Sequence, residues 1–360
     1  MADELPAKYK AVIYDKPGQI STKVVELDMP EPASGDVLIK LTHSGVCHSD
    51  YGTMMSSWAH LPPTQAGQVG GHEGVGHIVK MGPGTENSGV KVGDRVGVKW
   101  IAHICGSCPA CISGYDGACF NQKVSGVLNH PGTFQNYVTS QATYVTPIPD
   151  GLPSDAAAPM LCAGITVYSA LRKSNTQSGQ WVVLLGAGGG LGHLGTQIAS
   201  RGIGLRVIGI DSGSKRDFVL ESGAEHFIDF TASTDVTKDV MDLTDGLGAH
   251  AVINLTASNS AYALGMDLLR FGGTLVCAGI PEGDPVPIAK AFPQLLIGKS
   301  LKIVGIAVGD RKDAIEVLDL AARGIIKTHF RTEKMENLTE VFEQMHKGEV
   351  AGRVVLDLQA

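Results

Sequence analysis

Short apolar stretches bounded by Gly, Pro and Asp run through the first 150 residues of the chain. Each stretch either alternates apolar with polar residues or is apolar throughout, a pattern that predicts β-strands. The predicted strands are residues 8–16, 36–45, 74–80, 95–99 and 134–138. We therefore expect this part of the chain to be mostly β, with many turns.

From about residue 155, apolar strand patterns alternate with helical patterns. The predicted strands are 181–186, 206–211, 250–255, 274–279 and 301–306, and the predicted helices are 192–202, 214–222 and 259–270. This alternation favours an α/β fold with a doubly wound parallel sheet. Two helix patterns, 311–323 and 337–347, and the strand GRVVLDL follow. At 360 residues the chain is long enough for two domains, because single cores seldom exceed ~250–300 residues.

Composition and charge exclude several classes of protein. Hydrophobic residues make up 43% of the chain and charged residues 18%, which is typical of a globular protein and not of a disordered one. The formal net charge of −7 provides no basic field for nucleic acid. The N-terminus MADELPAKYKAVIYD is polar, and no run of ~20 apolar residues could cross a membrane, so we expect a soluble, cytoplasmic protein.

Four cysteines in the pattern Cys-x2-Cys-x2-Cys-x7-Cys are the strongest chemical signal: Cys105, Cys108, Cys111 and Cys119. Four thiolates in so short a segment can close a tetrahedral shell around one zinc ion, which makes the site structural. Free or disulfide-linked cysteines are the alternative interpretation. The chain has seven cysteines, an odd number, and an expected reducing compartment, so metal binding is favoured over disulfides.

The segment VVLLGAGGGLGHLGTQIA combines a buried strand, a glycine-rich turn and a helix start. Backbone N–H groups at a helix N-terminus suit a pyrophosphate. The glycine spacing, G-x-G-x-x-x-G, is one residue longer than the usual dinucleotide motif, and a glycine loop alone is weak evidence. The predicted coenzyme-binding residues of this turn are Gly186, Gly188, Gly189, Gly190, Leu191 and Gly192.

Asp211 strengthens the nucleotide hypothesis, because it ends the next predicted strand, 19 residues after Gly192. A carboxylate there accepts hydrogen bonds from the adenosine ribose and repels a 2′-phosphate, so NAD is predicted in preference to NADP. The alternative is a solvated turn residue. Lys215 and Arg216 follow closely and weaken the preference, and Arg216 is itself a predicted coenzyme contact.

Along its whole length the chain resembles a known family. The motifs GVCHSD (45–50), GHEGVG (71–76), LCAGITVYSAL (161–171), GAGGGLG, VIGID and AGRVV, with the cysteine lobe, resemble zinc-dependent medium-chain alcohol dehydrogenases, in particular the tetrameric ethanol-type enzymes of fungi and bacteria. The resemblance implies a Rossmann NAD-binding domain at 157–296 and a mostly β, GroES-like catalytic domain formed by 1–156 and 297–360. It also implies two zinc ions per subunit, NAD, a small alcohol or aldehyde substrate and a homotetramer.

The resemblance assigns a catalytic zinc to Cys47, His72 and Cys162, which spacing alone would not link. A Cys2His site with its fourth position open is a catalytic arrangement. Zinc there would act as a Lewis acid and lower the pKa of an alcohol. Taken alone, either cysteine would more often be a small buried hydrophobic residue.

The remaining roles also come from the resemblance. Ser49 would relay the substrate proton, Asp50 would orient the ligating histidine, and Glu73 would approach the zinc during ligand exchange. A turn residue, a helix N-cap and a structural ion-pair partner are the respective alternatives. His48, also counted among the catalytic residues, Arg353 and Val308 would contact the coenzyme. Trp58, Trp100 and Ile280 would wall the substrate pocket, and bulky walls favour small primary alcohols such as ethanol.

Gly52 departs from the family pattern. Related tetrameric enzymes commonly have a histidine at this position, five residues after the first zinc ligand, which passes the proton to solvent. Water or His60 would have to replace it here. General-base relays contribute about 10²–10⁴-fold, so turnover or its pH dependence should differ. The segment between Cys47 and His72 is also slightly longer than usual, which leaves the pocket wall around Trp58 open to question.

Three other functions compete with this interpretation. A reductase of aromatic or cinnamyl-type aldehydes would generally favour NADP, which Asp211 opposes. Zinc-free quinone reductases share the fold but lack both ligand sets. A non-catalytic zinc- and nucleotide-binding protein is the alternative from a different class, and an assay with ethanol and NAD separates it from an enzyme.

Overall fold

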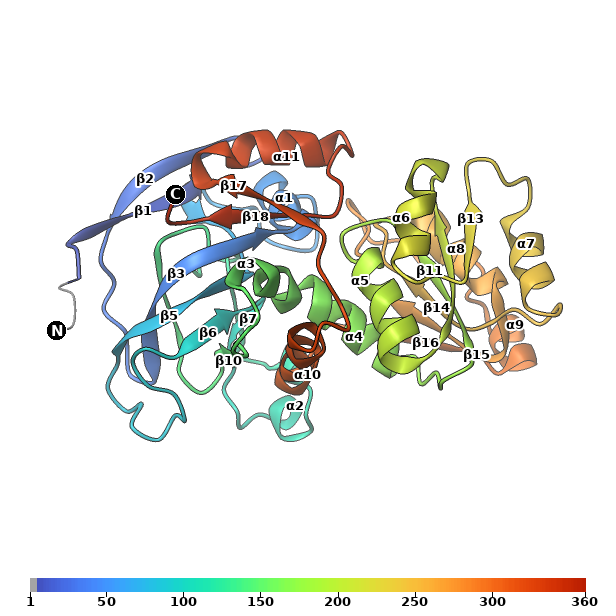
Figure 1. Ribbon diagram of the computed structural model, residues 1–360, viewed down its shortest axis with the longest axis horizontal. Coiled ribbons are helices and arrows are strands. Elements are labelled where there is room, and N and C mark those ends of the chain that lie inside the picture. Colours follow the sequence, from blue (N-terminus) through green and yellow to red (C-terminus); the bar gives the residue numbers. More distant parts are fainter. Residues whose placement is uncertain (1–4) are drawn as a thin grey trace. The chain divides into compact units, whose positions relative to one another are not determined.

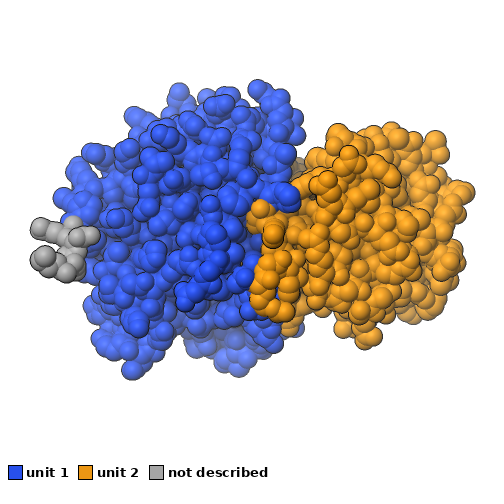
Figure 2. Space-filling view, viewed as in Figure 1, with its two compact units in different colours: residues 1–162, 310–322, 329–360 blue, residues 163–309, 323–328 orange. Residues whose placement is uncertain are grey.

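A computed structural model describes residues 5–360 and divides the chain into two compact units (Figure 2). Unit 1 comprises Met1–Cys162, Asp310–Ala322 and His329–Ala360, and unit 2 comprises Ala163–Gly309 and Arg323–Thr328. The first crossover therefore follows residue 162 and not 156, and the chain returns after residue 309 and not 296. The second boundary was predicted too early because strand β16 (Lys302–Gly305) completes the parallel sheet of unit 2.

Unit 1 is built mainly from antiparallel strands, with one parallel pair, β17 and β18 (Figure 1). A three-stranded sheet has the order β2-β1-β4, and a seven-stranded sheet has the order β10-β6-β5-β3-β18-β17 with β9 also pairing β3. The strands are β1 (Lys8–Tyr14), β2 (Thr22–Asp28), β3 (Asp36–Val46), β4 (Gln68–Val69), β5 (Gly74–Met81), β6 (Arg95–Val98), β9 (Tyr137–Gln141), β10 (Thr146–Pro147), β17 (Phe330–Lys334) and β18 (Arg353–Asp357), with a separate pair β7 (Ile101–His103) and β8 (Lys123–Val124).

The core of unit 1 forms where inward-facing residues of these strands meet a C-terminal helix. Tyr14, Phe134 and Phe342 are among its largest fully buried side chains. Burial of each such aromatic ring removes apolar area from water, which is the main force that holds the strands together. The helices of this unit are α1 (His48–Met55), α2 (Pro109–Ile112), α3 (Ser154–Ala157), α10 (Arg311–Ala322) and α11 (Leu338–His346).

Unit 2 contains a six-stranded parallel sheet with the order β13-β12-β11-β14-β15-β16. This order is the doubly wound arrangement that binds dinucleotides where the strand order reverses. Its central strand β11 (Trp181–Leu185) is buried at every position, as expected for a strand covered on both faces. The other strands are β12 (Arg206–Asp211), β13 (His226–Asp229), β14 (Ala249–Asn254), β15 (Leu269–Cys277) and β16.

The helices of unit 2 cover this sheet: α5 lies against β11, and α8 lies against β14 and β15 (Figure 1). Two of them, α7 and α8, begin at a capping side chain. Asp235 accepts the N–H of Lys238 at the start of α7, and Ser258 accepts the N–H of Ala261 at the start of α8. The helices are α4 (Ala163–Lys173), α5 (Gly192–Gln197), α6 (Arg216–Glu221), α7 (Val236–Leu243), α8 (Asn259–Asp267) and α9 (Pro293–Lys299).

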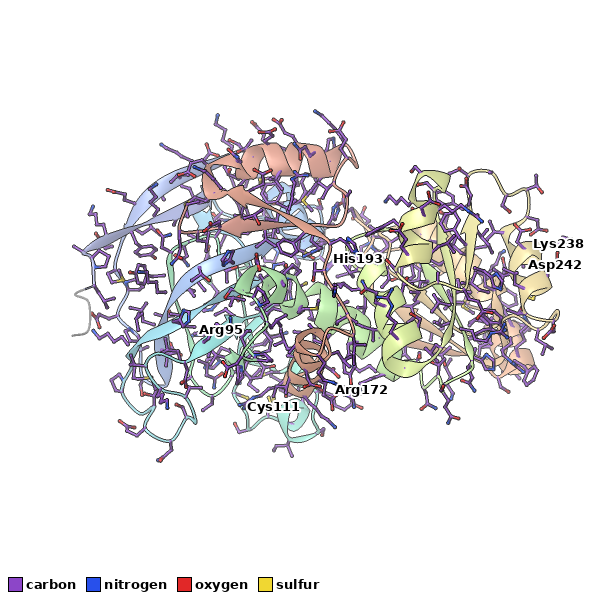
Figure 3. The ribbon with its side chains drawn as sticks, in the orientation of Figure 1. Arg95, Cys111, Arg172, His193, Lys238 and Asp242 are labelled. Atoms are coloured by element: carbon purple, nitrogen blue, oxygen red, sulfur yellow. The ribbon has the colours of Figure 1, made fainter. Side chains whose placement is uncertain are left out.

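The predicted elements are largely confirmed, with two kinds of difference. The predicted helix 192–202 is α5 followed by a π-helical segment, Ile198–Ile203. The elements that were not predicted are strands β2, β4, β7, β8, β10, β13 and β17 and helices α1, α2, α3, α4, α7 and α9. Helix α7 carries an exposed Lys238–Asp242 pair four residues apart (Figure 3). Within the described residues, no helix is both long and apolar enough to span a membrane.

Candidate active site and metal centres

Four buried side chains of unit 1 converge on one point: Cys47, His72, Glu73 and Cys162. Cys47 follows β3 and precedes α1, the His72–Glu73 pair joins β4 to β5, and Cys162 follows the short 3-10 turn Ala158–Leu161. One potential ligand atom from each residue lies within 4.8 Å of the others. The fold therefore brings together the three predicted ligands of the catalytic zinc, which come from distant segments.

Asp50 fixes the orientation of the His72 ring. Its Oδ1 lies 2.8 Å from Nδ1 of His72, and its Oδ2 accepts the backbone N–H of Cys47 at 2.9 Å. The Nε2 atom of His72 is buried and has no hydrogen-bond partner within the described residues. A buried nitrogen without a partner is costly, and a metal ion bound there would satisfy it. The donor set thus fits zinc, with Asp50 in the supporting role that was predicted.

The two thiols and the imidazole differ in how readily each loses its proton. The Cys162 thiol lies 3.9 Å from the Cys47 sulfur, and this contact lowers the pKa of Cys47 and raises the pKa of Cys162. Burial alone would lower the pKa of His72, but the charge of Asp50 and its hydrogen bond raise that pKa well above its usual range. Zinc binds cysteine as a thiolate and histidine as the neutral ring, so the lowered pKa of Cys47 favours the metal, whereas Cys162 and His72 would each release a proton when it binds.

Glu73 forms the structural ion pair that was the alternative to its predicted role, and that role near the zinc stays a prediction. Its Oε1 accepts a hydrogen bond from the buried guanidinium of Arg353, while its Oε2 is buried and has no partner within the described residues. Burial raises the pKa of Glu73 to about 7, against the opposing effect of Arg353. Arg353 was expected to face the coenzyme pyrophosphate, but its side chain is only 4% exposed and is committed to Glu73. Its contact with coenzyme stays a prediction.

Of the predicted pocket residues of unit 1, Trp100 contacts this group directly. The Trp100 ring stands edge-on to His72, with 4.8 Å between the ring centroids. Trp58 is buried, its indole N–H has no partner within the described residues, and it lines a cavity of about 240 Å³ together with Gly52. Ser49 is half-buried on α1. Nothing in this geometry contradicts the predicted roles, which stay predictions.

Gly52 packs directly beneath the Trp58 ring. A Cβ atom at position 52 would lie 3.0 Å from the ring carbon Cη2 of Trp58, so any side chain there must displace the indole by a few tenths of an ångström.

We expect Gly52→His to change the pH profile of alcohol oxidation, because an imidazole supplies a general base with a pKa near neutrality. Gly52→Ala, which adds the same Cβ without a titrating group, is the matched control. Identical profiles for the histidine and alanine variants would contradict this expectation.

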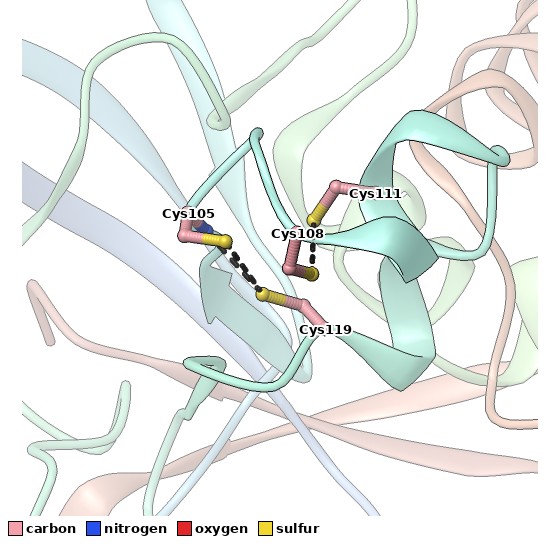
Figure 4. A group of neighbouring side chains, drawn as sticks. All are labelled: Cys105, Cys108, Cys111 and Cys119. Carbon is pink, nitrogen blue, oxygen red and sulfur yellow. Dashed lines mark hydrogen bonds between the residues drawn. The ribbon is translucent and has the colours of Figure 1, made fainter.

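The cysteine lobe brings its four sulfur atoms together as predicted (Figure 4). The Cys105–Cys119 and Cys108–Cys111 sulfur atoms are each 3.6 Å apart, and all four lie within 4.8 Å of one another. A tetrahedral shell with Zn–S bonds of roughly 2.3 Å requires sulfur atoms about 3.8 Å apart. The four sulfurs form no disulfide, so the donor set fits a closed, structural zinc site.

Backbone N–H groups support thiolates in this lobe. Those of Ser107 and Cys108 hydrogen-bond to Cys105 and lower its pKa to about 5, and the N–H groups of Cys111 and Phe120 lower the pKa of Cys108. Desolvation and the neighbouring Cys108 raise the pKa of Cys111 to about 12. Without a metal, the thiolate form is therefore favoured at Cys105 and Cys108 and disfavoured at Cys111. A bound divalent cation would stabilise the thiolate form of all the cysteines that bind it.

The glycine-rich turn of unit 2 lies between β11 and α5, at the carboxyl end of the central strand. Gly186 has a φ of 84°, which a residue with a side chain rarely adopts. A Cβ on Gly192 would lie 2.1 Å from the Gly186 carbonyl oxygen, so only glycine permits this close packing of the helix start. The extra residue in the motif is thus accommodated, and the predicted contact of this turn with a pyrophosphate stays a prediction.

Asp211 ends β12 beside this turn. Its Oδ2 accepts the N–H of Gly188 at 2.8 Å, its Oδ1 accepts the N–H of Ser212 at 2.8 Å, and the Lys215 ammonium lies 3.8 Å away. These bonds fix the carboxylate at the edge of the nucleotide site, which is where a ribose-binding acid is needed. The solvated-turn alternative does not describe this geometry, because the residue is buried.

The other predicted coenzyme and pocket residues are more exposed. His48 lies at the start of α1, 5.4 Å from the Tyr51 ring, and Arg216 lies over the Phe227 ring at 5.7 Å. Ile280 is 56% exposed, and Val308 adopts a left-handed φ of 58°, which is an outlier for a β-branched residue. Their predicted contacts with the coenzyme and the nicotinamide stay predictions.

Comparison with known proteins identifies the family. Residues 33–150 match the alcohol dehydrogenase GroES-like domain, and residues 190–323 match the zinc-binding dehydrogenase domain. Alcohol dehydrogenase 2 of Emericella nidulans is 62% identical over 365 residues, which cover 99% of this chain and 99% of that protein. The chain belongs to the zinc-dependent alcohol dehydrogenases.

Solved structures agree with this assignment. An alcohol dehydrogenase from the hyperthermophilic archaeon Aeropyrum pernix is 29% identical, with a TM-score of 0.85 over 97% of this chain and 99% of that one. A cinnamyl alcohol dehydrogenase, SbCAD4 of Sorghum bicolor, is 25% identical, with a TM-score of 0.82 over 98% of both chains. The predicted family, the combination of GroES-like and Rossmann-type domains and the alcohol dehydrogenase function are thereby confirmed.

One buried cation of this dehydrogenase was missed in the sequence. Lys99 is 3% exposed; its Nζ donates to the Tyr144 carbonyl at 2.8 Å and lies 3.6 Å from the centroid of that ring. The Tyr144 hydroxyl donates to Asp116 in the cysteine lobe, and Asp116 also accepts the N–H of Arg311 at the start of α10. The network joins the lobe to the rest of unit 1. A single lysine at the end of an apolar strand does not indicate from the sequence that its side chain is buried.

Burial lowers the pKa of Lys99 to about 7, with Arg311 adding to the effect and Asp116 opposing it. The unfolded chain, with a lysine pKa near 10.4, therefore binds more protons than the folded chain between pH 7 and pH 10, so stability rises with pH over that window.

Lys99→Met removes this titration. We expect the free energy of unfolding of the wild type, minus that of Lys99→Met, to increase by about 3 kcal/mol from pH 6 to pH 9. Urea titrations at the two pH values measure it, and an equal difference at both would refute it.

Proposed function

We propose that this alcohol dehydrogenase oxidises small primary alcohols reversibly to aldehydes, with NAD as the hydride acceptor. The observation that carries the proposal is the buried group formed by Cys47, His72 and Cys162, in which His72 Nε2 lacks a partner. When bound there, zinc would polarise the alcohol oxygen and lower its pKa. We also propose a second zinc in the cysteine lobe, which gives two per subunit.

The chain's own residues supply the remaining chemistry in this proposal. The Ser49 hydroxyl would relay the alcohol proton, because Oγ accepts that proton as the hydroxyl passes its own proton to water. Asp50 keeps the His72 ring in place through Nδ1. Glu73 holds one free carboxylate oxygen within the ligand group, ready to replace a departing ligand. The Trp100 ring, edge-on to His72, restricts the space beside the group, which supports small substrates over bulky aromatic ones.

The preference for NAD rests on Asp211. Replacing this carboxylate with alanine removes ribose-binding acceptors and the repulsion of a 2′-phosphate. A hydrogen bond to a charged group contributes about 1.5–3 kcal/mol, so we expect Asp211→Ala to lower kcat/KM with NAD by roughly 10–100-fold. The ratio of kcat/KM for NAD to that for NADP should fall with it. Asp217→Ala, which removes an exposed carboxylate from α6, is the control. An unchanged ratio in Asp211→Ala would count against the assignment.

Steady-state assays with a graded series of alcohols test the proposal. The purified protein, supplied with zinc, should oxidise ethanol and propan-1-ol with NAD more efficiently than cinnamyl or benzyl alcohol with NADP. The reverse order would favour an aromatic aldehyde reductase. Absence of turnover with every alcohol and both coenzymes would favour a protein that binds zinc and nucleotide without catalysis.

We further propose that the enzyme is a cytoplasmic homotetramer. The edge strand β16 is mostly exposed, with Ile303 36% exposed, and the adjacent helix α9 has no buried residue, with Ile297 78% exposed. An exposed apolar edge strand is a liability in a monomer, and a second copy of the chain would cover it. Light scattering that gives the mass of a single 37.7 kDa chain would rule out the oligomer.

A further inference from the structure

A polar pocket of about 130 Å³ lies at the amino ends of the central strands of unit 2. Gln180 immediately precedes β11, His250 is the second residue of β14, and Lys302 is the first residue of β16. The coenzyme site lies at the carboxyl ends of the same parallel strands. The pocket is therefore on the opposite edge of the sheet, and the dehydrogenase reaction makes no use of it.

A large bulge in β15 creates this pocket. Ala249 of β14 pairs with Leu269, and Ala251 pairs with Thr274, so four residues, 270–273, stand opposite His250 alone. Bulges re-aim side chains and occur preferentially near functional sites. Here the bulge places Arg270 with its Nη1 atom 2.9 Å from His250 Nε2.

His250 cannot satisfy both of its neighbours. The backbone N–H of Trp181 points to its Nδ1 at 3.2 Å, and the Arg270 guanidinium lies at its Nε2. Both groups only donate hydrogen bonds, whereas a neutral imidazole has a single acceptor nitrogen. Burial and the charge of Arg270 lower the pKa of His250, which keeps the ring neutral. When Nδ1 accepts the hydrogen bond from Trp181, the N–H at Nε2 faces the N–H groups of Arg270, and neither can accept from the other. An anion placed between them could accept hydrogen bonds from both the His250 ring and Arg270.

The charge around His250 is positive and uncompensated. Arg270 and Lys302 both line the pocket, and no Asp or Glu does. Between residues 5 and 360, no ion pair is found for either cation, although the whole chain has a net charge of −7. The hydroxyl of Thr176 adds a neutral hydrogen-bonding group to the same wall. A water molecule occupies ~30 Å³ in the liquid, so the pocket has room for about four, enough for a tetrahedral oxyanion.

We propose that this pocket binds a phosphate-type dianion, either free phosphate or the phosphoryl group of a small metabolite. Arg270 offers the planar fork of donors that matches phosphate oxygens, and Lys302 adds a point charge. His250 donates through Nε2 in the bound state and accepts from Trp181 through Nδ1. The inference is independent of the alcohol substrate proposed above.

Calorimetric titration of the intact enzyme tests the site. Inorganic phosphate and glycerol 3-phosphate are titrated in parallel, with saturating NAD to block the coenzyme site and with chloride to hold ionic strength constant. Binding of both supports a site for the phosphoryl group in general, and binding of the ester alone supports a metabolite ligand. Absence of binding by either at millimolar concentration overturns the proposal.

Three variants identify where the anion binds. Arg270→Gln and Lys302→Gln should each weaken binding about tenfold or more, because each removes a charge-assisted hydrogen bond. The Lys302 side chain is exposed and forms no ion pair among residues 5–360, so its variant should keep the fold even if Arg270→Gln does not. Because Lys302 begins the strand that the proposed oligomer would cover, the mass of each variant in solution is compared with that of the wild type. Lys23→Gln, which makes the same change of charge on β2 in unit 1, is the control. Equal affinity for phosphate in Lys302→Gln, Lys23→Gln and the wild type would overturn the proposal.

Discussion

Cys162→Ser is expected to lower kcat/KM for ethanol by on the order of 10³–10⁴-fold and to remove one zinc ion per subunit. Metal-ion catalysis supplies several kcal/mol of charge stabilisation, and each 1.36 kcal/mol corresponds to a factor of ten in rate. The serine hydroxyl has nearly the shape of the thiol but is a poor zinc ligand, so the buried group should lose affinity for the metal without a large cavity. Steady-state kinetics and elemental analysis of the same preparation measure both effects.

The matched control is Cys277→Ser. Cys277 is a half-buried thiol of β15 in unit 2 and belongs to neither ligand group. Its substitution should leave zinc content unchanged and activity within about threefold of the wild type. Full activity and unchanged zinc content in Cys162→Ser would show that Cys162 is a buried core residue and not a metal ligand.

Cys111→Ser is expected to destabilise the protein while leaving the chemistry of the active site intact. Structural zinc sites in isolated peptides contribute about 10–16 kcal/mol to folding. The lobe of this chain is also tied to the rest of unit 1 through Asp116 and Tyr144, so we expect a smaller loss, about 3 kcal/mol or more. For a large domain this corresponds to a drop in Tm of roughly 6–12 °C.

Zinc content, calorimetry and kinetics distinguish the loss of stability in Cys111→Ser from the loss of activity in Cys162→Ser. Cys111→Ser should retain one zinc per subunit and, at low temperature, a kcat within a few-fold of the wild type. Cys162→Ser should also retain one zinc but lose its activity. If Cys111→Ser kept the Tm and the zinc content of the wild type, the lobe would not be a zinc site.

Much of the fold follows from local patterns. β11 is apolar throughout and β12 is apolar between its terminal Arg206 and Asp211, because helices cover both faces of a parallel sheet, so the positions of both strands were predictable within a residue. β2 was missed because its side chains alternate between half-buried and exposed, and its sequence TKVVELD contains charges, as edge strands often do. The domain boundary near residue 297 was misplaced because one parallel strand remains beyond it.

The two metal centres differ in how far the sequence predicts them. The cysteine lobe is a local site, and its spacing alone indicates four sulfurs at one point. Cys47, His72 and Cys162 meet only through tertiary structure, so without the family motifs they would have remained unconnected. The pairing of Glu73 with Arg353, the burial of Lys99 and the bulge opposite His250 are also tertiary effects. No periodicity in the chain signals them.

Zinc content per subunit, measured with ethanol oxidation in the same preparation, tests the central claim most directly. We predict two zinc ions per subunit and turnover that depends on NAD. One zinc ion and no turnover would leave the cysteine lobe as the only metal centre. That result would contradict the assignment of Cys47, His72 and Cys162 as ligands, and the proposed reaction with it.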